Sequence, residues 1–376
     1  MLLYHPPRFL PLRPSRLDFA LPRRYHKLDM TEELLESLIC PACDAGSWQV
    51  RSQRTSATET IQRGELICTT CGARYPISDG IVDLLPQPDD VVRRERAGWE
   101  RFLRNSPEEF DEAWLLALPR IDDSVSSNPE SIARWRRQAD NFEGLIHHLG
   151  LSGRERVLEL GAGRCWASAY LARGGCHVVA LDVVRAKAAG GLETGQVYLD
   201  HGTPCFERVV ASMEKLPFRQ GTFDLLLSVA SIHHTALLDQ VVAECARVLR
   251  LGGKLALTSE PCIHVFKERQ VHNLETEMGI NEHVYNLLDY RKAFGKAGLS
   301  ARYCLPGALV AMLGEEELAV NVAKPKEWLF DLARRMWRRE TIRGLLGSQP
   351  ANFLGLLFLE YGLTAIAEKE LEMKVQ

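Results

Sequence analysis

The segments RVLELGAGRC, residues 156–165, and HVVALD, residues 177–182, decide the fold. The short apolar run before the glycines predicts a buried strand, and Gly161 and Gly163 predict a tight turn after it. The second segment predicts another strand, which ends at Asp182. Glycines after a first parallel strand let the backbone approach a ligand closely, and a carboxylate after the second strand can accept both hydroxyls of a ribose. The pattern therefore predicts an α/β, Rossmann-like fold that binds a ribose-containing cofactor.

A glycine turn of this kind serves two classes of cofactor, the nicotinamide dinucleotides and S-adenosylmethionine (SAM). Glu159 stands two residues before the first glycine, an acidic position typical of SAM enzymes. The third glycine of a dinucleotide fingerprint is missing, because Cys165 occupies its place before the helix expected over residues 166–173. Both features favour SAM.

Four further segments follow in order: SMEKLPF at 212–218, GTFDLLLS at 221–228, AECARVLRLGGK at 243–254 and LALTS at 255–259. Together with the glycine turn they resemble the ordered motifs of class I SAM-dependent methyltransferases. Residues 150–305 are similar to the small-molecule branch (methyltransferase type 11) that includes the ubiquinone and menaquinone methyltransferases. The resemblance implies a seven-stranded, mostly parallel sheet with an antiparallel last strand, and a SAM-dependent enzyme that methylates a small molecule.

The same resemblance implies roles for individual residues. The glycine turn would pass under the methionine part of SAM, Glu159 would support its amino group, and Asp182 would hold the ribose hydroxyls. Ser212 and Met213 would flank the adenine, although an Asp is common where Ser212 stands. The implied cofactor-binding set is Glu159, Gly161, Ala162, Gly163, Asp182, Ser212, Met213 and Ser228. Ser212, and Cys165 in a turn that is usually glycine, leave open a non-catalytic SAM-binding or scaffold protein.

Nearer the N-terminus, the pairs CPAC at 40–43 and CTTC at 68–71 have the spacing of two zinc knuckles. Two residues between cysteines let both thiolates of a turn point at one metal ion, so Cys40, Cys43, Cys68 and Cys71 predict a closed, structural zinc site. Two disulfides or a redox pair are the alternatives, and disulfides are not expected because residues 1–29 lack the continuous apolar region of a secretion signal.

Residues 31–86 resemble a family through LLESLICP at 34–41 and CGARYPISDGIVDLLP at 71–86. These segments are similar to the small zinc-ribbon proteins that partner tRNA, rRNA and protein methyltransferases. The resemblance implies that the ribbon contributes docking and stability, here within the same chain. A protein partner that binds through the ribbon is a further possibility.

An acceptor that carries a proton needs a base. His233 and His234 lie just beyond the expected fourth strand, Glu260 ends the fifth, and His283 follows in the run NEHVY; these are the catalytic candidates. In the family that the chain resembles, histidines at these places often only pack or form hydrogen bonds. The acceptor pocket is expected from two insertions, residues 261–290 and residues 306–350. The second contains Trp328, Phe330, Trp337 and the basic run RRMWRR at 334–339.

Composition sets limits on function. Hydrophobic content of 46% and charged content of 25% are ordinary for a globular protein, and the net charge of -3 argues against a strongly basic nucleic-acid binder. No apolar run reaches the roughly 18 residues of a membrane helix. A cytoplasmic location without membrane insertion is therefore expected. An rRNA or tRNA methyltransferase remains the second enzymatic reading, which this net charge disfavours.

These observations predict a chain of six parts. A basic tail that includes five prolines is expected to be disordered, and a charged connector with Trp99, Phe102, Trp114 and Trp135 is expected to form helices that could cover the ligand. The expected parts are the tail 1–30, the zinc ribbon 31–88, the connector 89–140, the SAM-binding core 141–305, the acceptor-side insertion 306–350, and the final strand and C-terminus 351–376.

Overall fold

The computed structural model describes residues 31–52, 61–104, 111–269, 271–314, 335, 348–358 and 362–370. The expected tail lies outside the described residues, as do Trp328, Phe330, Trp337 and all but Arg335 of the basic run. Within the described ranges, no helix is both long and apolar enough to cross a membrane.

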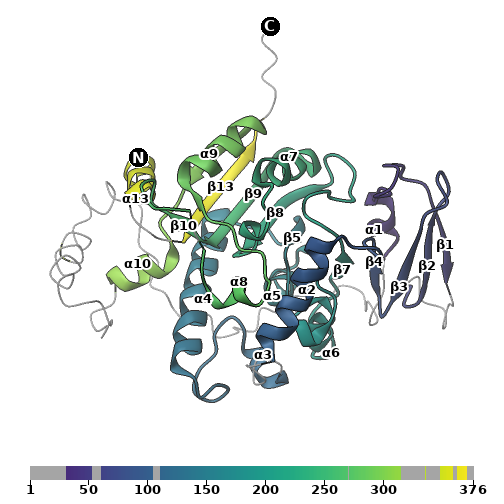
Figure 1. Cartoon of the computed structure of the whole chain (residues 1–376), viewed down its shortest axis with the longest axis horizontal. Coiled ribbons are helices and arrows are strands. Elements are labelled where there is room, and N and C mark those ends of the chain that lie inside the picture. The colour runs from purple at the N-terminus through teal and green to yellow at the C-terminus, as the bar shows by residue number, and fades with distance from the viewer. Residues whose placement is uncertain are drawn as a thin grey trace, which may run out of the picture.

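One sheet of eleven strands runs through the described residues in the order β1-β2-β3-β4-β7-β6-β5-β8-β9-β13-β12 (Figure 1). Its strands are β1 (Trp48–Ser52), β2 (Gly64–Cys68), β3 (Arg74–Ser78), β4 (Ile81–Asp83), β5 (Arg156–Leu160), β6 (His177–Asp182), β7 (Glu207–Val210), β8 (Phe223–Val229), β9 (Leu249–Glu260), β12 (Leu299–Tyr303) and β13 (Leu363–Lys369). The pair β10 (Cys262–Ile263) and β11 (Tyr285–Asn286) forms a separate small sheet.

Seven neighbouring strands of this sheet, in the order β7-β6-β5-β8-β9-β13-β12, form the seven-stranded core that the sequence predicted. Strands β7, β6, β5, β8 and β9 are mutually parallel, and β13 is antiparallel to both of its neighbours. The buried central strands read as continuous apolar runs because helices cover both faces of the sheet. The predicted α/β fold with an antiparallel last strand is confirmed.

Two buried apolar clusters lie on the two faces of this core. One is formed with α7 (Leu238–Val248), α9 (Leu287–Lys296) and α13 (Gln349–Phe358), and it continues into the ribbon with α1 (Glu32–Ser37). The other is formed with α3 (Glu112–Ala117), α4 (Pro129–Leu149), α5 (Trp166–Arg173) and α6 (Gly195–Asp200). Trp114 and Trp135 of the expected connector are core residues of this second face.

Helix α4 shows why the connector folds as it does. Asn128 caps its first turn by accepting the backbone N–H groups of Glu130 and Ser131, and Pro129 occupies the first helical position, where no hydrogen bond is lost. The helix ends at Gly150, whose φ of 59° terminates it in the left-handed conformation that glycine adopts most easily. Helix α10 (Gly307–Gly314) packs on α4, with Gly144 and Gly307 allowing a close approach.

The ribbon is not a separate unit, because its last strand extends the core sheet. Strand β4 pairs in parallel with β7, with Val82 opposite Val209. Two backbone hydrogen bonds also join the ribbon to the core: Leu84 N donates to Val210 O at 2.9 Å, and Ile39 N donates to Pro217 O at 2.9 Å. The sequence predicted a ribbon that precedes the core, but it gave no sign that the two sheets are continuous.

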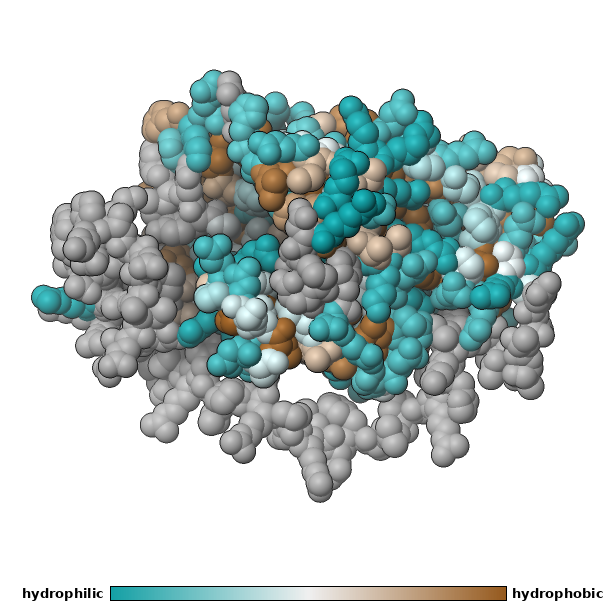
Figure 2. All heavy atoms as spheres, turned by 60° about the horizontal axis from the view of Figure 1, so that its bottom comes forward, coloured by the Kyte–Doolittle hydropathy of each residue, from teal (hydrophilic) through white to brown (hydrophobic). Residues whose placement is uncertain are grey.

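The described surface has no large apolar patch on the face drawn in Figure 2, where apolar residues are scattered among hydrophilic ones. The exposed large apolar side chains, such as those of Leu251, Phe266 and Leu354, come from separate elements. Single apolar residues of this kind are normal on a folded protein and do not indicate a docking surface.

Candidate active site

The carboxyl ends of the parallel strands share one edge of the sheet, and helix α2 (Asp90–Leu103) lies over it (Figure 1). Arg96 Nε of α2 donates to Val183 O, just beyond β6, at 2.6 Å. A Cβ on Gly98 would lie 2.9 Å from Ile280, so α2 also packs tightly on the loop that follows α8 (Leu274–Glu277). Helix α2 of the connector therefore covers the carboxyl edge of the sheet, and we call it the lid helix.

The glycine turn after β5 leaves no room for other side chains at its first position. Gly161 has φ of 62°, and a Cβ there would lie 2.5 Å from Ser231 Cβ. Cys165 also has positive φ, 59°, but its side chain is fully buried with Sγ 3.6 Å from Gly163 O. The cysteine thus turns into the core beneath the turn.

Two buried carboxylates flank this turn. Glu159 is 2% exposed and accepts a hydrogen bond from the Ser168 hydroxyl, while Asp182 accepts from Gly163 N at 2.8 Å and Val184 N at 2.7 Å. Burial raises the pKa of Glu159 to about 8, and burial likewise raises the pKa of Asp182 above its usual value. A cationic ligand would stabilise the ionised form of both groups.

Arg96 supplies a hydrogen-bond donor near the same carboxylates. Its Nη2 is buried and has no partner among the described residues, while its charge lowers the pKa of Asp182 against the larger effect of burial. Buried polar groups are nearly always hydrogen-bonded, so an unmatched donor at a candidate site is consistent with a missing ligand group. Arg96 was not among the residues predicted from the sequence to bind a cofactor.

The remaining candidate cofactor residues lie around the same edge. Ser212 Oγ accepts from Glu214 N at 3.1 Å in the turn after β7, and Met213 lies near Gly161. Ser228 is fully buried, and its hydroxyl lies 2.5 Å from Glu260 Oε1 and 2.8 Å from Ser231 Oγ. The hydroxyl of Ser228 is therefore committed to the protein interior, whereas Ser212 and Met213 lie at the strand ends.

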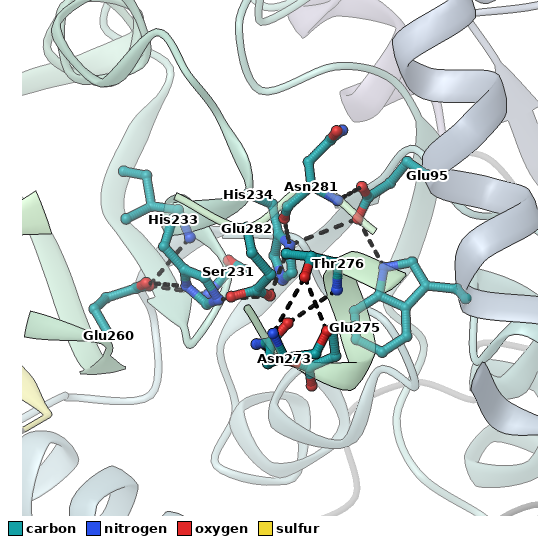
Figure 3. A network of polar contacts seen from close by, with 12 residues as sticks. Glu95, Ser231, His233, His234, Glu260, Asn273, Glu275, Thr276, Asn281 and Glu282 are labelled. Atoms are coloured by element: carbon teal, nitrogen blue, oxygen red, sulfur yellow. Dashed lines mark hydrogen bonds and ion pairs between the residues drawn. The ribbon is translucent and has the colours of Figure 1, made fainter. Parts of the chain in front are cut away.

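The two adjacent histidines meet a group of carboxylates, as Figure 3 shows. His233 Nδ1 lies 2.9 Å from Glu260 Oε2, and its Nε2 lies 3.5 Å from Glu282 Oε1. His234 Nδ1 lies 2.6 Å from the carbonyl oxygen of Asn281 and 3.6 Å from Glu95 Oε1. The cluster therefore joins the turn after β8, the end of β9, the 261–290 insertion and the lid helix.

The two histidines have opposite electrostatic surroundings. Burial alone would lower the pKa of His233, but hydrogen bonds with Glu260 and Glu282 outweigh burial and raise it to about 10. Burial and the neighbouring charge of His233 lower the pKa of His234 to about 4. At neutral pH, His233 is therefore an imidazolium held between carboxylates, and His234 is neutral and donates its Nδ1 proton to the Asn281 carbonyl.

The structure brings three of the four catalytic candidates together and adds residues that the sequence analysis missed. His283 N donates to His233 O at 3.1 Å, and its ring lies 6.5 Å from that of Tyr285. Glu282, its neighbour, reaches the cluster with its carboxylate. Glu95 reaches it from α2, where its oxygens accept from Trp99 Nε1 at 2.8 Å and Asn281 N at 2.6 Å. A glutamate on the buried face of an otherwise exposed helix was the signal for Glu95.

The four cysteines of the ribbon converge as the spacing predicted. Cys40 Sγ and Cys71 Sγ are 3.7 Å apart, Cys43 Sγ and Cys68 Sγ are 3.6 Å apart, and all four sulfurs lie within 4.8 Å of one another. Tetrahedral zinc with Zn–S bonds of about 2.3 Å separates its sulfurs by roughly 3.8 Å. All four cysteines are free thiols, and Tyr75 OH lies 3.3 Å from Cys40 Sγ. The donor set and its spacing therefore fit a zinc ion.

Two segments of the chain match known families. Residues 158–257 match the family described as "Methyltransferase domain", and residues 31–80 match the family described as "Trm112p-like protein". Both matches agree with the resemblances that the sequence motifs carry.

Relatives of known name match parts of the chain. Sarcosine/dimethylglycine N-methyltransferase of Halorhodospira halochloris is 33% identical over 33% of this chain and 43% of the relative. Methyltransferase GfsG of Streptomyces halstedii is 31% identical over 42% of this chain and 59% of the relative. The chain spans between about a fifth and three fifths of the length of such relatives.

A solved complex that contains the Haloferax volcanii Trm112 methyltransferase activator is similar over 70% of this chain and 98% of the solved chain, with 15% identity and a TM-score of 0.42. Geranyl diphosphate methyltransferase, solved with geranyl diphosphate and sinefungin, covers 74% of this chain and 100% of its own, with 17% identity and a TM-score of 0.47.

Proposed function

This chain carries a methyltransferase domain joined to a Trm112p-like zinc-ribbon domain, and we propose that it transfers a methyl group from SAM to a small-molecule acceptor. The observation that carries the proposal is the pair of buried carboxylates, Glu159 and Asp182, at the glycine turn. SAM places its ammonium and sulfonium groups near the glycine turn, where ionised Glu159 would attract them, whereas Glu159 would repel the pyrophosphate that a dinucleotide places at such a turn.

The residues of the turn have separate tasks in this proposal. Gly161 and Gly163 let the backbone pass close under the methionine part of the cofactor, and Glu159 faces its ammonium group. Asp182 accepts the ribose hydroxyls, and Ser212 and Met213 flank the adenine. Arg96, whose Nη2 lacks a partner among the described residues, offers a donor to the cofactor from the lid.

When bound, SAM supplies an activated methyl group on a good leaving group. The protein then has to hold the acceptor atom about 3 Å from the methyl carbon and exclude water. The cluster of His233, His234 and Glu282 lies at the end of β8 on the acceptor side, and the lid helix closes over it. We assign to this cluster the task of positioning the acceptor. Glu260, fully buried beneath His233, positions that histidine.

The four cysteines would hold a structural zinc ion, and the ribbon would stabilise the core through its shared sheet. About 50 residues bury too little apolar surface to fold firmly alone, so metal binding supplies folding energy to such a domain. The chain segment after β4 leads directly into the lid α2. The ribbon therefore supports both β7 and the start of the lid.

An RNA acceptor is the second enzymatic reading. The acceptor side contains the carboxylate of Glu282, and because its hydrogen bond with His233 outweighs burial and lowers its pKa, it stays ionised and would repel a phosphodiester backbone. The local charge therefore favours a small-molecule acceptor.

Calorimetric titration of the zinc-loaded protein with SAM tests the cofactor assignment. We expect micromolar binding in the wild type and a loss of at least tenfold in Asp182→Asn, which keeps the size of the side chain and removes its charge. Asp200→Asn, in an exposed position at the end of α6, is the matched control and should bind as the wild type does. A well-folded wild type that binds no SAM would leave the scaffold reading in place of the enzyme. Salt-sensitive binding of RNA would instead support the second reading.

A further inference from the structure

We propose that His233, His234 and Glu282 form a binding site for a divalent transition-metal ion on the acceptor side of the active site. One potential ligand atom of each residue lies within 4.8 Å of those of the other two. The two histidines come from the turn after β8 and the glutamate from the loop before β11 (Figure 3). Two imidazoles and one carboxylate are a ligand set of catalytic zinc and non-haem iron sites.

The spacing of the polar atoms supports a shared ion. Glu282 Oε1 lies 3.5 Å from His233 Nε2 and 3.5 Å from His234 Nδ1, and Glu95 Oε1 lies 3.6 Å from His234 Nδ1. These distances exceed the 2.7–2.9 Å or so of a charge-assisted hydrogen bond. They match the roughly 3.4 Å between two ligand atoms of a tetrahedral site with metal–ligand bonds of about 2.1 Å. Glu282 Oε1 therefore lies at a metal-ligand separation from one nitrogen of each histidine, and its hydrogen bond with His233 is a long one.

Contacts outside the ligand set orient it. Glu260 Oε2 binds His233 Nδ1 at 2.9 Å, which leaves Nε2 directed at Glu282, the arrangement that a carboxylate imposes on many metal-binding histidines. His234 Nδ1 now donates its proton to Asn281 O at 2.6 Å. A bound ion would replace that proton, and the carbonyl oxygen is close enough to become a further ligand.

The charges of the cluster also suit a cation. Histidines are the ion-pair partners of all three carboxylates, Glu95, Glu260 and Glu282. All three carboxylates have side chains less than a tenth exposed. A divalent ion bound here would displace the His233 proton that now faces Glu282, so positive charge would be kept among the carboxylates.

The role of the ion rests on the proposed methyl transfer, although its binding does not. A divalent ion that coordinates an acceptor hydroxyl lowers the pKa of that hydroxyl, so the oxygen can attack as an alkoxide or phenolate while its proton leaves to solvent or a nearby carboxylate. The site thus indicates an acceptor of the hydroxyl class, such as a phenol, an enol or an alcohol.

Cobalt titration of the intact, zinc-loaded protein tests the site, because the visible spectrum separates the two kinds of ligand. We expect one further equivalent of Co²⁺ to bind, with d–d absorption and without the sulfur-to-cobalt charge-transfer band that the ribbon cysteines would produce. Glu282→Gln should weaken this binding at least tenfold. Glu275→Gln changes a neighbouring carboxylate of α8 outside the ligand set and should bind cobalt as the wild type does.

The outcomes separate this proposal from the proposed function. Wild-type protein that takes up no cobalt beyond the ribbon equivalent, or Glu282→Gln protein that binds it equally well, would overturn the metal site, and SAM binding would still decide the methyltransferase reading. If Glu282→Gln does not fold, as judged by loss of ribbon zinc and of the melting transition, His234→Asn repeats the test. Equal cobalt affinity in that variant would likewise overturn the proposal.

Discussion

Gly161→Ala should both destabilise the protein and weaken SAM binding. The new Cβ would lie 2.5 Å from Ser231 Cβ and 2.8 Å from Ser231 Oγ. Ser231 has little freedom to move, because its hydroxyl donates to Leu160 O at 2.6 Å and its backbone N–H donates to Glu260 at 3.0 Å. The glycine turn itself would have to shift, and with it the backbone that lies under the proposed cofactor.

The magnitude follows from two contributions. The left-handed conformation, φ 62°, costs a residue with a Cβ about 1–2 kcal/mol, and overpacking against an immobile neighbour costs about 1–3 kcal/mol. Gly202 has φ of 81° with nothing within 4 Å of its added Cβ, so Gly202→Ala carries the conformational cost alone. The difference between the two variants, about 1–3 kcal/mol, isolates the overlap with Ser231.

Denaturant unfolding of the wild type and both variants measures this difference, and calorimetric titration with SAM measures the effect on the site. We expect Gly161→Ala to bind SAM at least tenfold more weakly and Gly202→Ala to bind it normally. Equal losses of stability in the two variants, or normal SAM affinity in Gly161→Ala, would refute the packing argument.

Three further outcomes are expected. Because burial raises the pKa of Glu159 from 4.5 to about 8, the unliganded protein should lose stability as pH rises between these values, and its affinity for SAM should rise with pH through about 8. Unfolding measurements and SAM titrations at several pH values check these two outcomes, and Glu159→Gln should make both stability and affinity less dependent on pH. Arg96→Gln should speed the release of SAM by up to roughly tenfold, because the charged hydrogen bond from Arg96 to Val183 O is lost. Arg93→Gln, on the exposed face of α2, should leave the release rate unchanged, and equal SAM release rates for the two variants in stopped-flow experiments would contradict this role of the lid helix. Chelation of zinc should lower the melting temperature and SAM affinity together, and retention of both would exclude support of the core by the ribbon.

Local sequence patterns predicted the first half of the core closely. The strand predicted before the glycine turn and the helix predicted over residues 166–173 occur as β5 and α5 with those bounds. The apolar patterns also predict the last two strands over residues 301–305 and 362–367, and these occur as β12 and β13 with each end within two residues of its predicted position. Each of these elements has an apolar pattern bounded by glycine or charged residues, and such patterns are visible in a single segment.

The parts that escaped prediction depend on contacts between distant segments. The pairing of Val82 with Val209 joins residues more than a hundred positions apart, and neither strand shows in its own pattern which edge it will meet. In the run NEHVY, residue type alone favours His283, because histidine is the most common general base. The backbone instead directs the side chain of Glu282 at the histidine cluster. Neighbouring side chains of an extended segment point in opposite directions, but the sequence alone does not show which of the two points toward the cluster.

The pairing of β4 with β7 also fixes the ratio of ribbons to catalytic domains at one to one. A stabilising subunit on a separate chain must be found by diffusion, and its supply limits how many catalytic domains are supported. Here the linker after β4 and the shared sheet give every catalytic domain its own ribbon at a high effective concentration, which does not change when the protein is diluted. The same pairing occupies the edge of β4, so a second catalytic domain could bind that edge only by displacing β7 of its own chain.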